Sequence, residues 1–143
     1  MYGVNRVCAH NILLQNQIMP YQIPLEDNHQ ISLEVAVDMT TLYRENMQEI
    51  LKDEYQNEGI LANCETFSLS VLDSLQKIPD VAAFRIYYGM STDLKIHAIL
   101  VGVDANGNDI LPSENSEEEG GEIFEEGQRC PTFCPPPSPL NGE

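Results

Sequence analysis

The chain has 143 residues, 42% of them hydrophobic, a length and composition typical of one soluble domain with its own core. Its 23 acidic and seven basic side chains give a net charge of −16. DNA and RNA binding need Lys and Arg to neutralise phosphates, so this charge argues against nucleic-acid partners and against attraction to anionic membranes.

The N-terminal segment, residues 1–31, shows no strong periodicity and is predicted to be irregular, with a short candidate strand at 21–23 between Pro20 and Pro24. Within residues 1–20, the apolar run at residues 12–14 is too short for a signal-peptide core. No apolar stretch approaches the roughly 18 residues of a membrane span. We therefore expect a cytoplasmic protein, whose thiols are normally reduced.

Two helices follow in the prediction. Apolar residues recur every three or four positions from Val35 to Leu51, which predicts a helix over 33–54 with Ser32 as its N-cap. A shorter helix is predicted over 67–77, because leucines recur at helical spacing and a proline at position 79 ends the pattern.

The period then changes to two, which indicates strands. Residues 84–88 alternate, and the four-residue gap at 90–93 precedes a longer strand over 94–103, as in an antiparallel hairpin. The longer strand is apolar on both faces towards its end, so we expect it to be central and covered on one side by the helices. A turn at Asn106-Gly107 leads to a third strand at 109–111. The prediction is an α+β domain over residues 32–112, with two helices packed on a small antiparallel β-meander.

Residues 113–128 are predicted to be an acidic linker, and residues 129–143 an irregular tail rich in Cys and Pro. The stretch 104–127 holds nine acids and no base, so it carries −9 of the net −16. Such a charge run is typical of a solvated linker, and it would also suit a basic protein partner or divalent cations.

Cys130 and Cys134 have a spacing allowed for half of a zinc site. A structural site needs two more ligands, and Cys8 with His10 is the only other pair close in sequence. Two alternatives remain open, a redox or disulfide-forming pair and thiols that only pack or face solvent. The absence of a second Cys pair favours simple thiols, and the four cysteines do not resemble a disulfide framework.

Other patterns give little support for metal or catalytic chemistry. Asp104–Asp109 resembles the start of a calcium loop, but its glycine stands where a hairpin turn requires it, so we predict a turn. No nucleophile or phosphate-loop motif is present. His97 lies mid-strand, which favours packing over a role as general base. We therefore expect a protein that is not an enzyme.

The tail composition suits recognition. Residues 135–137 are three prolines, which prefer the extended polyproline II shape that docks into grooves. Arg129, Cys130, Phe133 and Cys134 are the candidate partner contacts. Two placements compete: the tail folds back and buries Phe133 and both cysteines, or it is presented to another protein.

Four stretches also resemble a family of small bacterial proteins of unknown function, namely residues 40–44, 84–90, 97–111 and 129–141. The most specific is the terminal motif Arg-Cys-Pro-x-x-Cys-Pro-Pro-x-Ser-Pro-Leu-Asn. The resemblance implies that the tail belongs to the protein, and it implies no activity or functional residues.

These observations favour a cytoplasmic, non-enzymatic protein-interaction module whose acidic linker and Cys/Pro-rich tail contact a protein partner. The alternative is a metal-binding or redox-responsive protein that uses Cys130 and Cys134.

Overall fold

The structure is a computed structural model that describes residue 23 and residues 28–113 and 120–142. Cys8, His10 and most of the candidate strand at 21–23 lie outside the described residues. The predicted α+β class with a β-meander is confirmed. The elements in chain order are α1 (Leu33–Asn46), the short 3-10 helix η1 (Asp53–Tyr55), β1 (Cys64–Thr66), α2 (Leu69–Lys77), β2 (Val81–Met90), β3 (Ile96–Asp104), β4 (Asp109–Ile110), β5 (Ile123–Phe124) and β6 (Gln128–Cys130).

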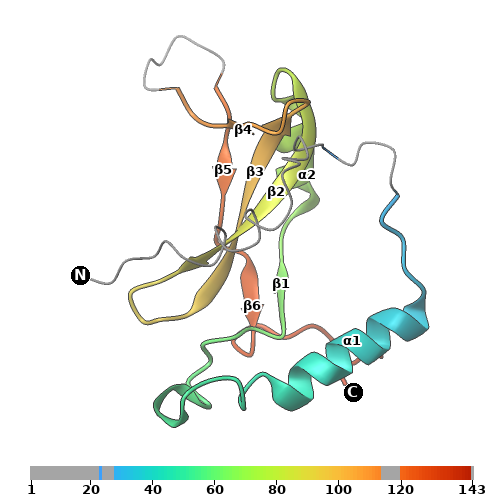
Figure 1. The fold of residues 1–143 in the computed structure, drawn as a ribbon, viewed down its shortest axis with the longest axis vertical. Helices are drawn as coiled ribbons and strands as arrows, with labels where there is room; N and C mark the ends of the chain where they lie inside the picture. Colours follow the sequence, from blue (N-terminus) through green and yellow to red (C-terminus); the bar gives the residue numbers. More distant parts are fainter. Residues whose placement is uncertain (1–22, 24–27, 114–119, 143) are drawn as a thin grey trace, which may run out of the picture.

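A long β2–β3 hairpin forms the centre of the molecule (Figure 1). The strands pair antiparallel from Val81 opposite Asp104 to Met90 opposite Ile96. On the other edge of β3, β4 pairs with Gly102 and Val103, and β5 pairs with the two residues before them. β3 is therefore central, as predicted, and its residues 100–103 are buried.

The predicted turn after β3 is confirmed by its hydrogen bonds. The Asp104 carboxylate accepts the backbone N–H groups of Asn106 at 2.8 Å and of Asn108 at 2.9 Å. Gly107 has a φ of 88°, a conformation that glycine adopts without steric cost. The Asn108 side chain and backbone donors lower the pKa of Asp104.

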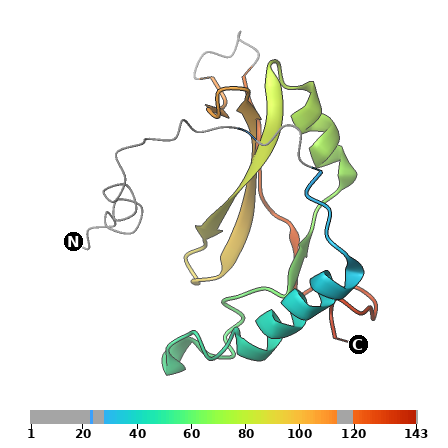
Figure 2. The same ribbon diagram turned by 45° about the vertical axis from the view of Figure 1, so that its right-hand side comes forward.

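α2 covers one face of the sheet (Figure 2). The Ser68 hydroxyl accepts the N–H of Ser70 and caps the helix, so α2 begins two residues later than predicted. Leu75 and Ile78 pack with Leu100 as the buried core cluster.

α1 is shorter than the predicted helix, which extended to residue 54. The last turn closes where the Met47 N–H donates to Tyr43, and the Asn46 side chain donates to a backbone carbonyl within the same turn. Asn side chains compete in this way with the helical backbone. Ile50 beyond it is 73% exposed, so no apolar contact holds a longer helix in place.

No helix among the described residues is long and apolar enough to cross a bilayer.

A separate two-stranded sheet joins β1 to β6 and lies near α1 and the C-terminus, at one end of the hairpin (Figures 1 and 2). Neither of these strands, nor β5, was predicted from the sequence. The residues predicted to be an acidic linker include β5, and the predicted tail begins inside β6. Strands of two or three residues are too short to show a period, and only their tertiary pairing defines them.

Candidate functional site

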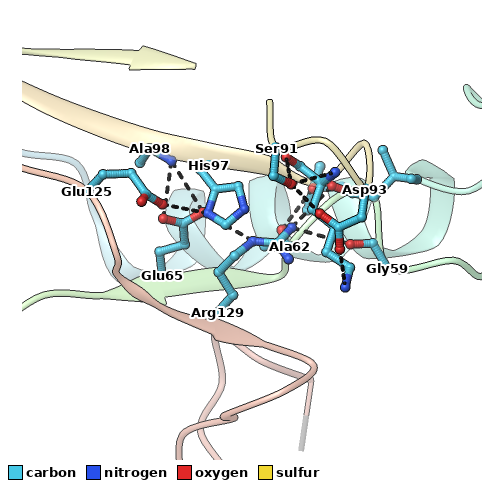
Figure 3. Close-up of polar contacts among 12 residues, drawn as sticks. Gly59, Ala62, Glu65, Ser91, Asp93, His97, Ala98, Glu125 and Arg129 are labelled. Carbon is cyan, nitrogen blue, oxygen red and sulfur yellow. Dashed lines mark hydrogen bonds and ion pairs between the residues drawn. The ribbon is translucent and has the colours of Figure 1, made fainter. Parts of the chain in front are cut away.

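Glu65 on β1 joins the two sheets (Figure 3). The Ile96 N–H donates to the Ile60 carbonyl at 2.9 Å, and the Ala98 N–H donates to the two Glu65 carboxylate oxygens at 3.3 and 3.2 Å. β5 does not extend along this part of β3. The Glu65 carboxylate therefore accepts the Ala98 N–H at a position where a neighbouring strand would place a backbone carbonyl. The contact fixes the β1–β6 sheet against the hairpin.

Arg129 on β6 is buried, with 7% of its surface exposed, and it is opposite Glu65 in the β1–β6 register. Its Nη2 donates to the carbonyls of Gly59 and Ile60 at 3.3 and 3.1 Å. Its Nε lies 3.5 Å from Glu65 Oε1, close enough for an ion pair but without hydrogen-bond alignment. A buried charge is costly unless it is paired, so this contact is structural.

His97 approaches a second carboxylate. Its Nδ1 lies 2.7 Å from Glu125 Oε1, a residue that follows β5. This distance is short enough for an ion pair when the His97 ring is protonated. The ring N–H does not point at the carboxylate well enough to donate a hydrogen bond. His97 was predicted to pack between strands, and its carboxylate neighbour was not foreseen.

An apolar cavity of about 360 Å³ lies beside this cluster. The Tyr43 hydroxyl donates to the Ala62 carbonyl at 2.9 Å at its wall. Burial raises the pKa of Tyr43, and the Arg129 charge partly offsets that rise, so the phenol is a neutral donor at pH 7. The other lining residues include Phe67, Ile86, Tyr88, Leu100 and Cys64. The walls suit apolar groups, because the charged side chains are engaged with one another or with the backbone.

Cys130 and Cys134 form a disulfide, which corrects the expectation of simple thiols. The Phe133 N–H donates to the Arg129 carbonyl at 2.7 Å, and this turn brings the two cysteine Cα atoms to 4.5 Å. Cysteine binds zinc as a thiolate, which neither cysteine of a disulfide offers. Within the described ranges, no three His, Cys, Asp or Glu residues are grouped to hold a metal ion.

Cys64 keeps a free, half-buried thiol, and its Cα partner across the β1–β6 ladder is Cys130. The pairing of these two cysteines was not predicted from the sequence. Their 66-residue separation gives no local signal, and only the pairing of two unpredicted strands brings them together.

The tail folds back on α1. Arg44 of α1 donates to the Leu140 carbonyl. The Asn141 side chain donates to the Pro136 carbonyl at 2.8 Å and accepts the Ser138 N–H at 2.8 Å. Yet Phe133 remains 63% exposed, so the tail is folded back and still presents its aromatic side chain.

The four candidate contacts therefore separate into two groups. Arg129 and Cys130 are buried in contacts within the chain, and their side chains are not available to a partner. Phe133 and Cys134 are exposed. Only these two stay as predicted contacts of the tail.

The outer edge of β2 is a second exposed feature, and no described strand pairs with it. Ile96 and Ala98 of β3 direct their N–H groups away from β2. Because hydrogen-bonded pairs alternate in antiparallel ladders, their partners Met90 and Tyr88 direct their own backbone groups outward. The side chains of this alternate set share one face and are exposed: Phe84, Ile86, Tyr88 and Met90.

The alternation in residues 84–88 predicts a strand, and the same pattern also contains the signal for this apolar row.

In comparisons with family models, curated proteins and solved structures, nothing matches the chain. The family resemblance of the terminal motif therefore stays a prediction.

Proposed function

We propose that the protein is a non-enzymatic interaction module that binds an extended segment of a protein partner along the outer edge of β2. The observation that carries this proposal is a ten-residue strand whose outer edge has no described partner and whose apolar row is exposed. Such an edge is a template for strand addition. Backbone hydrogen bonds would give affinity, and alternate side chains would give specificity.

The partner segment would alternate apolar and basic residues. The chain carries a net charge of −16, so basic side chains gain long-range attraction. A second copy of the chain would bring another −16 to the same interface, which disfavours a homodimer. The acidic residues near 113–128 and the exposed Phe133 would add a second contact, as the tail composition suggested.

The cytoplasmic location stays an expectation. A disulfide that forms in that compartment is usually transient, because cytoplasmic thiols are kept reduced. The Cys130–Cys134 bond would then be one that forms and breaks during function, which also keeps the redox-responsive alternative open.

The proposal can be tested with a fluorescent synthetic peptide of alternating valine and lysine and the full chain, by anisotropy. Tyr88, at 82% exposure, is the most exposed residue of the row. We expect Tyr88→Lys to weaken binding by about tenfold, the effect of losing one central aromatic contact. The matched control is Ile50→Lys, which adds the same charge at an exposed apolar residue outside β2.

Equal affinity of the Tyr88→Lys and Ile50→Lys variants would contradict the proposal. Sedimentation supplies a second measurement, and we expect a monomer. A dimer that Tyr88→Lys dissociates would assign the edge to a second copy and overturn the basic partner.

A further inference from the structure

We infer that Cys64 is the attacking thiol of an internal thiol–disulfide exchange site, with the Cys130–Cys134 disulfide as its substrate. The inference is independent of the β2 edge. It assigns Cys64 a role in disulfide exchange, which the redox interpretation of the tail, limited to Cys130 and Cys134, did not include.

The register of the β1–β6 ladder carries the argument. Cys64 and Cys130 are direct Cα partners in an antiparallel pair. Such partners have Cα atoms about 4.5–5.5 Å apart and side chains on the same face. A disulfide requires Cα atoms about 4.4–6.8 Å apart. A Cys64–Cys130 bond is therefore compatible with the strand positions as they are.

The exchange is balanced without an external reagent. The Cys64 thiol loses its proton, and the thiolate sulfur attacks Cys130 Sγ. The Cys64–Cys130 bond forms as the Cys130–Cys134 bond breaks, and the electron pair leaves with the Cys134 sulfur. Cys134 then takes up a proton, so one disulfide and one thiol are present before and after the step.

The burial of each cysteine indicates which sulfur is attacked and which is released. Cys130 is 5% exposed, which shields its sulfur from external thiols, whereas its strand neighbour Cys64 is already beside it. Cys134 is exposed and would be released as a thiol next to Phe133. The product is a surface thiol able to react with disulfides of the glutathione class or with a protein disulfide.

The tryptic peptides make the two disulfide states distinguishable. Cys130 and Cys134 share the peptide 130–143, whereas Cys64 lies in the peptide 53–77. The full chain, incubated without reductant at pH 8 and then blocked with N-ethylmaleimide, is digested and analysed by mass spectrometry. We expect a cross-linked pair of these peptides and N-ethylmaleimide on Cys134. Both signals should increase from pH 6 to pH 8, because the thiolate is the nucleophile.

Cys64→Ser should abolish both the cross-link and the labelling of Cys134, whereas the matched Cys8→Ser variant should retain them. A trap variant guards against a misfolded Cys64→Ser protein. In Cys134→Ser, the Cys64 and Cys130 thiols should reduce one oxidised glutathione to two glutathione molecules and form the cross-strand bond. Labelling of Cys64 but never of Cys134 in the unmodified chain, together with no cross-strand bond in the trap variant, would overturn the inference.

Discussion

At the scale of single residues, the Glu65 carboxylate is the contact that holds the two sheets together. It accepts from the β3 backbone at Ala98 and pairs with the buried Arg129 guanidinium. Arg129 in turn binds the carbonyls of the loop before β1. Removal of either charge would leave the other buried without its counter-ion.

We predict that Arg129→Met lowers the free energy of unfolding by about 3–5 kcal/mol, the cost typical of breaking a buried ion pair. Urea denaturation measures this change. The double variant Arg129→Met/Glu65→Gln should recover much of the loss, because the glutamine carbonyl still accepts from Ala98 and carries no charge. A loss below about 1 kcal/mol for Arg129→Met would indicate a pair that behaves like a surface contact.

Asp93, in the turn of the hairpin, provides a prediction about pH. A hydrogen bond from Ser91, followed by the contact with Lys95, lowers the pKa of Asp93 to about 2. A depressed carboxyl pKa stabilises the fold above the ordinary value of about 3.9, and this stabilisation is lost as the pH falls towards 2.

Ser91→Ala should therefore raise the pKa of Asp93 towards its ordinary value, as followed by the carboxyl ¹³C shift in an NMR titration. Ser70→Ala is the matched control, because it removes a hydroxyl from α2, and it should leave the pKa of Asp93 unchanged. An Asp93 that titrates identically in all three proteins would show that the Ser91 contact is absent in solution.

At the scale of elements, the sequence was informative wherever a period extends over several residues. The alternation in β2, the apolar β3 and the Ser32 cap of α1 all predicted real structure. The strands β1, β5 and β6 have two or three residues each, so no period could reveal them.

The candidate site was predicted less well for the same reason. Cys64 and Glu65 gain their significance from opposing Cys130 and Arg129, and that pairing belongs to the tertiary structure. Arg129 is a predicted partner contact of the tail, yet it is buried, because the sequence does not reveal its partner Glu65 on a distant strand.

The element boundaries also predict which part of the tail can be removed. Deletion of residues 128–143 removes β6 and Arg129, whereas deletion of 135–143 leaves the sheet and the disulfide intact. We expect cooperative thermal unfolding to persist in the shorter deletion and to be lost in the longer one, as measured by circular dichroism. A cooperative transition in both would show that the β1–β6 sheet is dispensable.

At the scale of the whole molecule, charge and apolar surface are distributed unevenly. Residues 104–127 carry −9 of the net −16, whereas the strand β2 contains one basic residue, Arg85, and no acid. Arg85 is bound by Asp109 of β4. The molecule thus combines a concentrated acidic region with an apolar strand edge, and this combination supports the proposal of a basic and extended partner.

The pairing of β1 with β6 has a consequence for the order in which the chain folds. The β2–β3 hairpin connects residues close in sequence, whereas the β1–β6 ladder joins Cys64 to Cys130 across the whole hairpin. Closing a longer loop costs more chain entropy, so local pairs form first. The hairpin is thus expected to be the folding nucleus, and β6 to dock late, once nearly all of the chain has been synthesised.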